Sequence, residues 1–119
     1  MNLFGTVLRG LGTAIGFHEE RHKVISENLA NSETPGYRAR RLEFDAELLR
    51  AFESDGTSPA DPTSLAEIDR TAPMKADRNT VDLDTEMARM SENSLRTVAL
   101  SRMLARKYAG LKTAIVGTR

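Results

Sequence analysis

Apolar residues recur every three or four positions over the first 29 residues of the chain. This spacing is typical of a heptad repeat, in which one row of side chains faces a partner helix. The row consists of Phe4, Leu8, Leu11, Ile15, His18, His22, Ile25 and Leu29. A second row beside it contains Leu3, Val7, Gly10, Ala14, Phe17 and Val24. Because one partner helix cannot cover both rows, the pattern predicts a long helix with more than one neighbour.

Glycines at positions 5, 10, 12 and 16 interrupt the first half of this helix. Each weakens an isolated helix by about 1 kcal/mol relative to alanine. They are compatible with simple tolerance or with the close approach of another helix in an assembly. In either case we expect this half to become well ordered only when something packs on it.

The four-three spacing returns in the last third of the chain, from Val81 to Val116. The predicted row is Leu83, Met87, Met90, Ser94, Thr97, Ser101, Leu104, Tyr108, Leu111 and Ile115. Asp82 is a suitable N-cap, and acidic residues at the start with basic residues near the end complement the helix dipole. A second apolar row, Leu95, Val98, Ala105 and Ala109, again exceeds what one partner can bury.

Thr34-Pro35-Gly36 ends the first helix at a defined place. Proline cannot continue a helix, and glycine permits the positive φ that other residues resist. The neighbouring Asn28, Asn31 and Tyr37 suit side-chain-to-backbone hydrogen bonds better than catalysis.

Between the two helices the pattern changes twice. Five apolar residues predict a short helix or compact segment: Leu42, Phe44, Leu48, Leu49 and Phe52. Residues 53–80 then contain three of the four prolines and carry a net charge of −3, which predicts a linker or loop. No strand pattern is visible. We therefore expect an all-α fold, an antiparallel coiled-coil-like hairpin divided into residues 1–52, 53–80 and 81–119.

Each predicted row is apolar at its ends and polar in the middle. In an antiparallel hairpin these polar middles could face each other and fix the register of the two helices. The facing residues would be His18 and His22 on one helix and Ser94, Thr97 and Ser101 on the other. This hypothesis requires a hydrogen bond between at least one of the histidines and the C-terminal helix.

Composition narrows the possible functions. The 119 residues contain 17 basic and 17 acidic side chains and no cysteine. The balanced charge gives no reason to expect nucleic acid as a partner, and disulfides and thiolate metal sites are excluded. Residues 1–17 carry one charge but include four glycines and no cleavage site, so we interpret them as mature sequence. They are also shorter than the 20 or so apolar residues of a membrane-spanning helix.

His18-Glu19-Glu20-Arg21-His22 matches the H-E-x-x-H motif of zinc hydrolases. A catalytic zinc needs a third protein ligand, and the chain has no other histidine. Both histidines also fall in the heptad row, which explains their spacing without a metal. We therefore expect no metal, no cofactor and no enzymatic activity, and keep the zinc hydrolase only as an alternative from another functional class.

The segment I-S-E-N-L-A-N-S-E-T-P-G-Y-R-A resembles the signature of the bacterial flagellar axial proteins, the family of rod, hook and hook-associated subunits. The matching positions are Asn28, Ala30, Asn31, Thr34, Pro35, Gly36 and Tyr37. Leu29 replaces the more common isoleucine. R-R-L-E-F-D-A-E-L, D-R-N-T-V-D-L-D-T-E-M-A-R-M-S-E-N and L-A-R-K-Y-A-G-L-K-T-A-I are similar to a proximal rod protein. The resemblance covers roughly residues 1–52 and 73–117.

This resemblance implies a structural subunit of the flagellar basal body rod in the periplasm, exported without a cleaved signal and needed for motility. It implies assembly with copies of itself, with rod subunits of the FlgC, FlgF and FlgG type, with FliE, with the membrane ring protein FliF and with the export gate. The neighbouring proximal rod protein FlgC is the alternative within the family. A soluble coiled-coil adaptor is a third interpretation that the heptads alone would permit.

Overall fold

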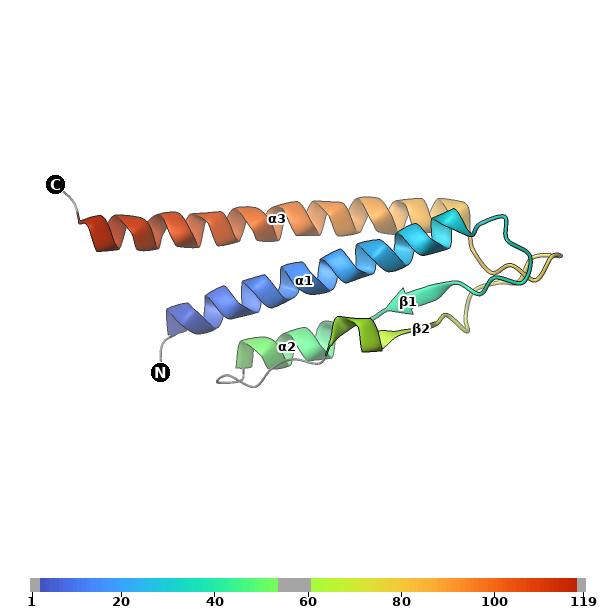
Figure 1. The fold of residues 1–119 in the computed structure, drawn as a ribbon, viewed down its shortest axis with the longest axis horizontal. Coiled ribbons are helices and arrows are strands. Elements are labelled where there is room, and N and C mark those ends of the chain that lie inside the picture. Colours follow the sequence, from blue (N-terminus) through green and yellow to red (C-terminus); the bar gives the residue numbers. More distant parts are fainter. Residues whose placement is uncertain (1–2, 54–60, 118–119) are drawn as a thin grey trace.

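The computed structural model describes residues 3–53 and 61–117 of the chain. Two long helices, α1 (Leu3–Ala30) and α3 (Leu83–Val116), lie side by side and run antiparallel (Figure 1). The molecule measures 67 × 28 × 15 Å, so it is a long, thin hairpin. The predicted all-α fold with its antiparallel helical hairpin is confirmed.

Four short elements pack on α1 on the side away from α3 (Figure 1). They are β1 (Arg40–Leu42), α2 (Asp45–Glu53), the 3-10 helix η1 (Pro62–Leu65) and β2 (Ala66–Ile68). The two strands pair antiparallel, with Arg41 opposite Glu67. The sequence shows no strand pattern, so the expectation of a structure without strands is wrong on this point. Three residues per strand are too few for an alternating pattern to appear in the sequence.

The hydrophobic core lies between α1 and these short elements. Phe17 and Val24 of α1 are buried against Leu42 and Phe44. The rings of Phe17 and Phe44 stack with their centroids 5.1 Å apart. Burying a phenylalanine side chain contributes roughly 1.5–3 kcal/mol. So small a core leaves much of the hairpin to be held by polar contacts.

The glycines of α1 have different surroundings. Gly10 lies directly beneath Phe52 of α2, and a Cβ at this position would overlap the phenylalanine ring. Close approach therefore explains Gly10, although the approaching helix belongs to the same chain. Around Gly12 and Gly16 a Cβ would meet no atom of the described part of the chain within 4 Å.

Both ends of α3 are capped. The side chain of Asp82 accepts a hydrogen bond of 3.3 Å from the backbone N–H of Thr85, which confirms the predicted N-cap. The helix ends at Gly117, whose φ of 76° is favourable only for glycine and whose N–H donates to Thr113 O at 3.0 Å. Among the helices of the described residues, none combines the length and the hydrophobicity that crossing a membrane requires.

Candidate functional site

The first helix ends in a tight corner at the T-P-G segment. The N–H of Asn31 donates to Glu27 O at 3.1 Å, and the N–H of Tyr37 donates to Thr34 O at 3.2 Å. Gly36 has a φ of 76°, in the left-handed region that a side chain disfavours. Asn31 Nδ2 also donates to Glu27 O at 2.8 Å, and Thr34 Oγ1 donates to Asn31 Oδ1 at 3.1 Å. The corner residues therefore bond the end of the helix and one another.

Asn28 lies at the centre of this corner and is fully buried. Its Nδ2 donates to Arg40 O at 2.8 Å and to Glu86 Oε2 at 3.1 Å. Its Oδ1 accepts from Tyr37 OH and from the N–H of Arg40, both at 3.1 Å. An amide side chain has two donor hydrogens and two acceptor positions. All four are used, so Asn28 links α1 to β1, to α3 and to the corner.

A second buried asparagine, Asn79, joins the corner to the loop before α3. Its Nδ2 donates to Asn31 O and to Thr34 O, each at 2.8 Å. Its Oδ1 accepts from the N–H of Val81 at 2.7 Å. One side chain thus bonds the end of the first helix, the following turn and the start of the last helix.

The two loops at this end also bond each other through the backbone. The N–H of Gly36 donates to Asp77 O at 2.9 Å, and the N–H of Thr80 donates to Tyr37 O at 3.0 Å. The N–H of Ala39 donates to Thr80 Oγ1 at 2.8 Å. The T-P-G-Y corner is therefore held by contacts within one chain.

Glu86 places a buried carboxylate beside this network. Its Oε1 lies 2.9 Å from Arg89 Nη1, and its Oε2 accepts from Asn28 Nδ2. A buried charge is tolerated when it is paired and hydrogen-bonded, and both conditions hold here. Removal of Arg89 would leave the charge unpaired, and removal of Asn28 would leave Oε2 without this hydrogen-bond donor.

Tyr37 connects the turn to the buried Asn28 side chain. Its hydroxyl donates to Asn28, which requires the neutral phenol. Burial, assisted by the nearby Glu27 carboxylate, raises the pKa of Tyr37 above its ordinary value. Tyr37 therefore remains a hydrogen-bond donor at neutral pH.

Nearer the start of α1, ten residues before Asn28, His18 pairs with Asn93 of α3. His18 Nδ1 lies 2.7 Å from Asn93 Oδ1, and Asn93 Nδ2 donates to His18 O at 2.7 Å. Because the amide nitrogen faces the carbonyl, the amide oxygen accepts from His18 Nδ1–H. The ring also meets Phe44 edge-on, with centroids 4.9 Å apart. Burial lowers the pKa of His18, although the bond to Asn93 opposes this shift.

The polar layer predicted between the two helices therefore exists but has different members. His18 bonds α3, as the hypothesis required, whereas His22 is exposed. The partner on α3 is Asn93. It replaces the three predicted partners, Ser94, Thr97 and Ser101.

The H-E-x-x-H segment does not present its two histidines to a common ligand. His18 is buried with Nδ1 bonded to Asn93, while His22 faces outward. Within residues 3–53 and 61–117, no three side chains of the histidine, cysteine, aspartate or glutamate type gather closely enough to hold a metal ion. The geometry gives a zinc hydrolase no support.

The predicted row on α1 lies on its packed side. Leu11 and Ile25 are buried, while Leu8, Ile15 and Leu29 are half-buried. Members of the second row are also buried: Gly10, Ala14, Phe17 and Val24. Both rows of α1 are thus largely occupied within this chain, one toward α3 and the other toward the short elements.

On α3 the predicted row is divided. Met90, Leu104 and Leu111 are half-buried. The remaining apolar members are exposed: Leu83, Met87, Tyr108 and Ile115. The residues of α3 that are buried or half-buried at heptad spacing are Glu86, Met90, Asn93, Thr97, Leu100, Leu104 and Leu111. The face of α3 turned inward is therefore partly polar, and several apolar members of the predicted row stay exposed.

Sequence reasoning missed three residues of the polar network, Asn79, Glu86 and Asn93. Asn79 lies within the D-R-N-T-V segment, which carried the family resemblance without an assigned role. Glu86 and Asn93 are seven residues apart, so they share one helix face, and this spacing was a signal that could have found them. They were missed because each lies one position away from the predicted row, next to Met87 and Ser94.

Comparison with known proteins identifies the family. A protein of Cereibacter sphaeroides named "Flagellar basal body rod protein FlgB" is 34% identical over 114 residues, covering 87% of this chain and 89% of its own length. The chain belongs to the FlgB family. A FlgB protein of Bacillus subtilis is 28% identical over 127 residues and 98% of each chain, and the FlgB of Escherichia coli K12 is 33% identical over 107 residues, covering 75% of this chain and 78% of its own.

These FlgB relatives come from distant bacteria and cover most of the chain, which favours FlgB over the alternative FlgC. No protein-family model matches the chain. The family is one of structural flagellar rod proteins, and it places the chain in the flagellar basal body.

Proposed function

We propose that this chain is a structural subunit of the proximal flagellar rod, and that it assembles by packing its two long helices against neighbouring axial subunits. The observation that carries the proposal is the apolar surface left uncovered on α3. Leu95 and Ile115 are 72% and 75% exposed, and further large apolar side chains are exposed beside them: Val98, Met103, Tyr108 and Val116. A helix that exposes several large apolar side chains is a candidate interaction surface.

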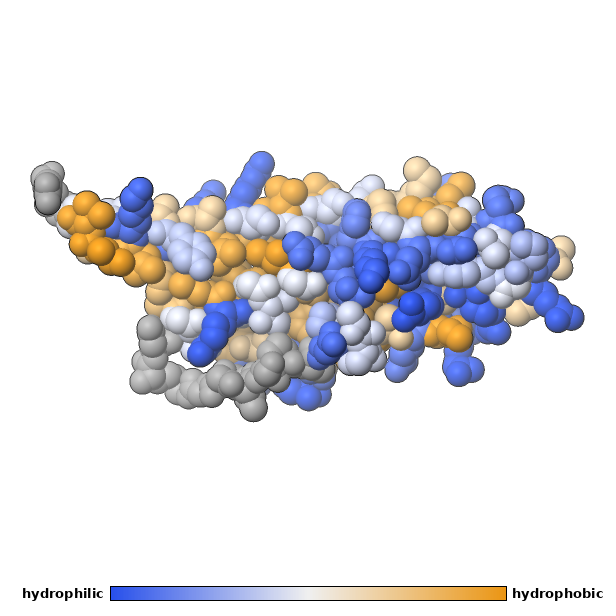
Figure 2. All heavy atoms as spheres, in the orientation of Figure 1, coloured by the Kyte–Doolittle hydropathy of each residue, from blue (hydrophilic) through white to orange (hydrophobic). Residues whose placement is uncertain are grey.

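The distribution of this surface supports end-to-end and lateral packing. Figure 2 shows hydrophobic side chains gathered toward the end of the molecule that holds both termini, whereas the opposite half is mainly hydrophilic. The predicted row residues Met87, Tyr108 and Ile115 would then contact neighbours, and Leu104 and Leu111 would contact α1. In this arrangement the rod is built by helices, without a catalytic step.

The corner has a different role in this proposal. Its motif residues are Asn28, Asn31, Thr34, Pro35, Gly36 and Tyr37. Their hydrogen bonds lie within one chain, which supports a role in fixing the corner of each subunit before it meets the next. Thr34, Pro35 and Gly36 are exposed at the tip and are available to an adjacent subunit.

The proposed partners are further copies of the chain, rod subunits of the FlgC, FlgF and FlgG type, FliE, the membrane ring protein FliF and the export gate. The proposed location is the periplasmic rod, reached through the flagellar export apparatus without a cleaved signal. Nucleic acid is not among the proposed partners, because acidic and basic residues balance at 17 each.

Deletion of the gene, followed by imaging of isolated basal bodies, tests this proposal. We expect a non-swimming strain whose basal bodies lack rods and hooks, restored by the intact gene on a plasmid. Intact rods and normal swimming in the deletion strain would overturn the proposal.

A further inference from the structure

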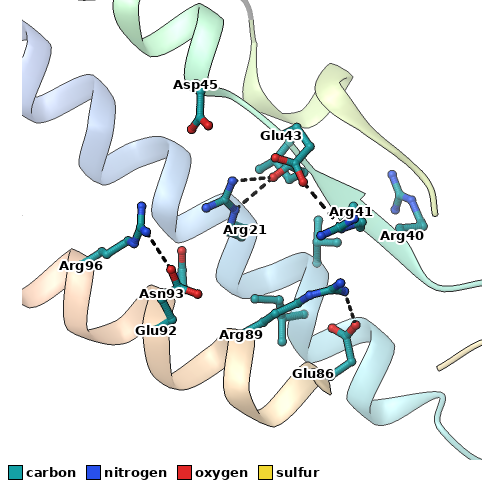
Figure 3. A pocket seen from close by; sticks show the side chains of 13 residues that line it. Arg21, Arg40, Arg41, Glu43, Asp45, Glu86, Arg89, Glu92, Asn93 and Arg96 are labelled. Carbon is teal, nitrogen blue, oxygen red and sulfur yellow. Dashed lines mark hydrogen bonds and ion pairs between the residues drawn. The ribbon is translucent and has the colours of Figure 1, made fainter. Parts of the chain in front are cut away.

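A charged cleft of about 260 Å³ opens on one face of the molecule, between α1, α3 and the β1–α2 junction (Figure 3). Val24 and Ile25 of α1 contribute apolar surface, and five arginines and four acidic residues make up most of the remaining lining. Pockets for organic ligands usually measure about 300–1,000 Å³. This cleft is therefore sized for one or two side chains.

Four of the five arginines are already paired with carboxylates of the chain. Arg89 lies 2.9 Å from Glu86, and Arg96 lies 2.7 Å from Glu92. The other two pairs are looser: Arg40 is 3.6 Å from Glu27 and Arg41 is 3.6 Å from Glu43. These pairs neutralise the rim of the cleft.

Arg21, in the middle of the cleft, is different (Figure 3). Its Nε and Nη2 donate to the carbonyl oxygen of Leu42 at 3.0 and 2.8 Å, and its guanidinium carbon lies 4.0 Å from the centroid of the Phe44 ring. A guanidinium carries five N–H donors, so three have no acceptor among the described residues. Within the described part of the chain, no carboxylate lies within 4.0 Å of Arg21.

The surroundings of Arg21 fix the position of its guanidinium but supply no carboxylate partner from the described residues. The neutral carbonyl and the aromatic face fix the plane of the guanidinium without neutralising it. Burial lowers the pKa of Arg21, and the distant Glu43 and Asp45 carboxylates oppose the shift, yet an arginine remains protonated in a protein. A carboxylate that reached the unused N–H groups would form charge-assisted hydrogen bonds with a pre-oriented donor.

We propose that this cleft receives an acidic side chain of a neighbouring rod subunit, whose carboxylate pairs with Arg21. The inference rests on the proposed function, because it requires a neighbour. Arg21 is the arginine of the lining that no carboxylate of the described residues pairs with, which suits one incoming carboxylate, whereas the carboxylates of Glu43, Asp45 and Glu92 around the cleft would repel a multiply charged free anion. The apolar floor of Val24 and Ile25 suits the methylene groups of a glutamate.

The test is complementation of the deletion strain with full-length variants. Arg21→Gln removes the charge but keeps an N–H donor for the Leu42 carbonyl, and Arg70→Gln removes an exposed arginine away from the cleft as a matched control. Loss of a desolvated charge pair at an interface weakens association by roughly 30-fold or more. We expect rod-bearing basal bodies to fall at least in that proportion with Arg21→Gln and to stay at wild-type yield with Arg70→Gln.

Circular dichroism and thermal unfolding of the purified variants separate folding from assembly. If Arg21→Gln folds like the wild type and also yields normal basal bodies, the inference is wrong, while the rod function stands because the empty deletion strain still lacks rods. If Arg21→Gln fails to fold, suppressors of a non-swimming Arg21→Glu strain decide the question. Replacement of an acidic residue by lysine or arginine in a rod subunit supports the cleft contact. Suppressors confined to the core around Phe44 contradict it.

Discussion

The two ends of the hairpin are built on opposite principles. At the corner end, buried polar side chains such as Asn28, Asn79 and Glu86 satisfy one another within the chain. At the end that holds both termini, α3 leaves Tyr108 and Ile115 exposed and extends past the start of α1 (Figure 1). The corner is complete in a single chain, whereas the open end has apolar surface without a partner among residues 3–53 and 61–117.

The difference indicates how stability and assembly are separated. A directional polar network specifies one geometry, because every donor must find its acceptor. An apolar surface is less specific and gains free energy from any complementary surface that covers it. Substitutions at the corner should therefore change the free energy of unfolding of the single chain, and substitutions at the open end should change association.

The largest effect is expected from Asn28→Ala. The change removes four hydrogen bonds and leaves the buried Glu86 carboxylate with one partner fewer, at a cost of about 3 kcal/mol in the free energy of unfolding. Urea denaturation followed by circular dichroism measures it. Asn31→Ala, at a half-buried position one turn on, should cost about 1 kcal/mol. Equal losses in the free energy of unfolding for the two variants would show that Asn28 does not contribute more to the corner than Asn31.

The next effect is a loss of stability in acid through His18. Burial lowers its pKa below the ordinary 6.5, so the unfolded chain takes up the proton first as the pH falls. The contribution of neutral His18 is complete above about pH 6.5 and decreases below it, by up to about 1.4 kcal/mol per pH unit. Denaturation between pH 7.5 and 5 should reveal this slope. His18→Gln should flatten it, and the exposed control His22→Gln should leave it unchanged.

A smaller effect distinguishes two glycines of α1. Gly12→Ala should stabilise the helix by up to about 1 kcal/mol, because its Cβ meets open space. Gly10→Ala gains the same helix propensity but pushes the Phe52 ring away, so its net effect should be near zero or destabilising. Thermal unfolding measures both. In a Phe52→Ala background Gly10→Ala should become as stabilising as Gly12→Ala, and a persistent difference would place the strain elsewhere.

The smallest effect on the single chain is expected at exposed apolar residues of α3. Leu95→Ser and Ile115→Ser alter side chains that are largely exposed, so each should change the free energy of unfolding by no more than about 0.5 kcal/mol. The same variants should greatly reduce the yield of rod-bearing basal bodies in the complemented deletion strain. Normal yields from both would mean that these side chains stay uncovered in the rod.

The long helices and the break between them could be predicted because each depends on a repeated or strongly local signal. The heptads of residues 4–29 and 83–115 extend over many turns, and Pro35 and Gly36 act on their own backbone. The β1–β2 ribbon could not be predicted, because such short strands depend on the tertiary fold. Here the fold places Arg41 of β1 opposite Glu67 of β2.

The residues of the site that lie close to the turn in sequence could be predicted, but their distant partners could not. Asn28, Asn31 and Tyr37 were found through their closeness to the turn, but their partners Asn79 and Glu86 lie 48 and 58 residues away from Asn31 and Asn28. Hydrophobic periodicity could not show which side of α3 faces α1. In the single chain Glu86 and Asn93 occupy inward positions, and Met87 and Tyr108 are exposed.

The long reach of the corner bonds also governs when the chain can fold. Asn79 and Asn93 bond segments that precede them by 48 and 75 residues, so α1 is complete on the ribosome well before either partner has been made. Contacts between such distant residues must close a large loop before they contribute free energy, which slows folding. The glycine-interrupted start of α1 cannot hold the helix by itself in the meantime. Folding of this subunit is therefore a late event that awaits synthesis of its last third.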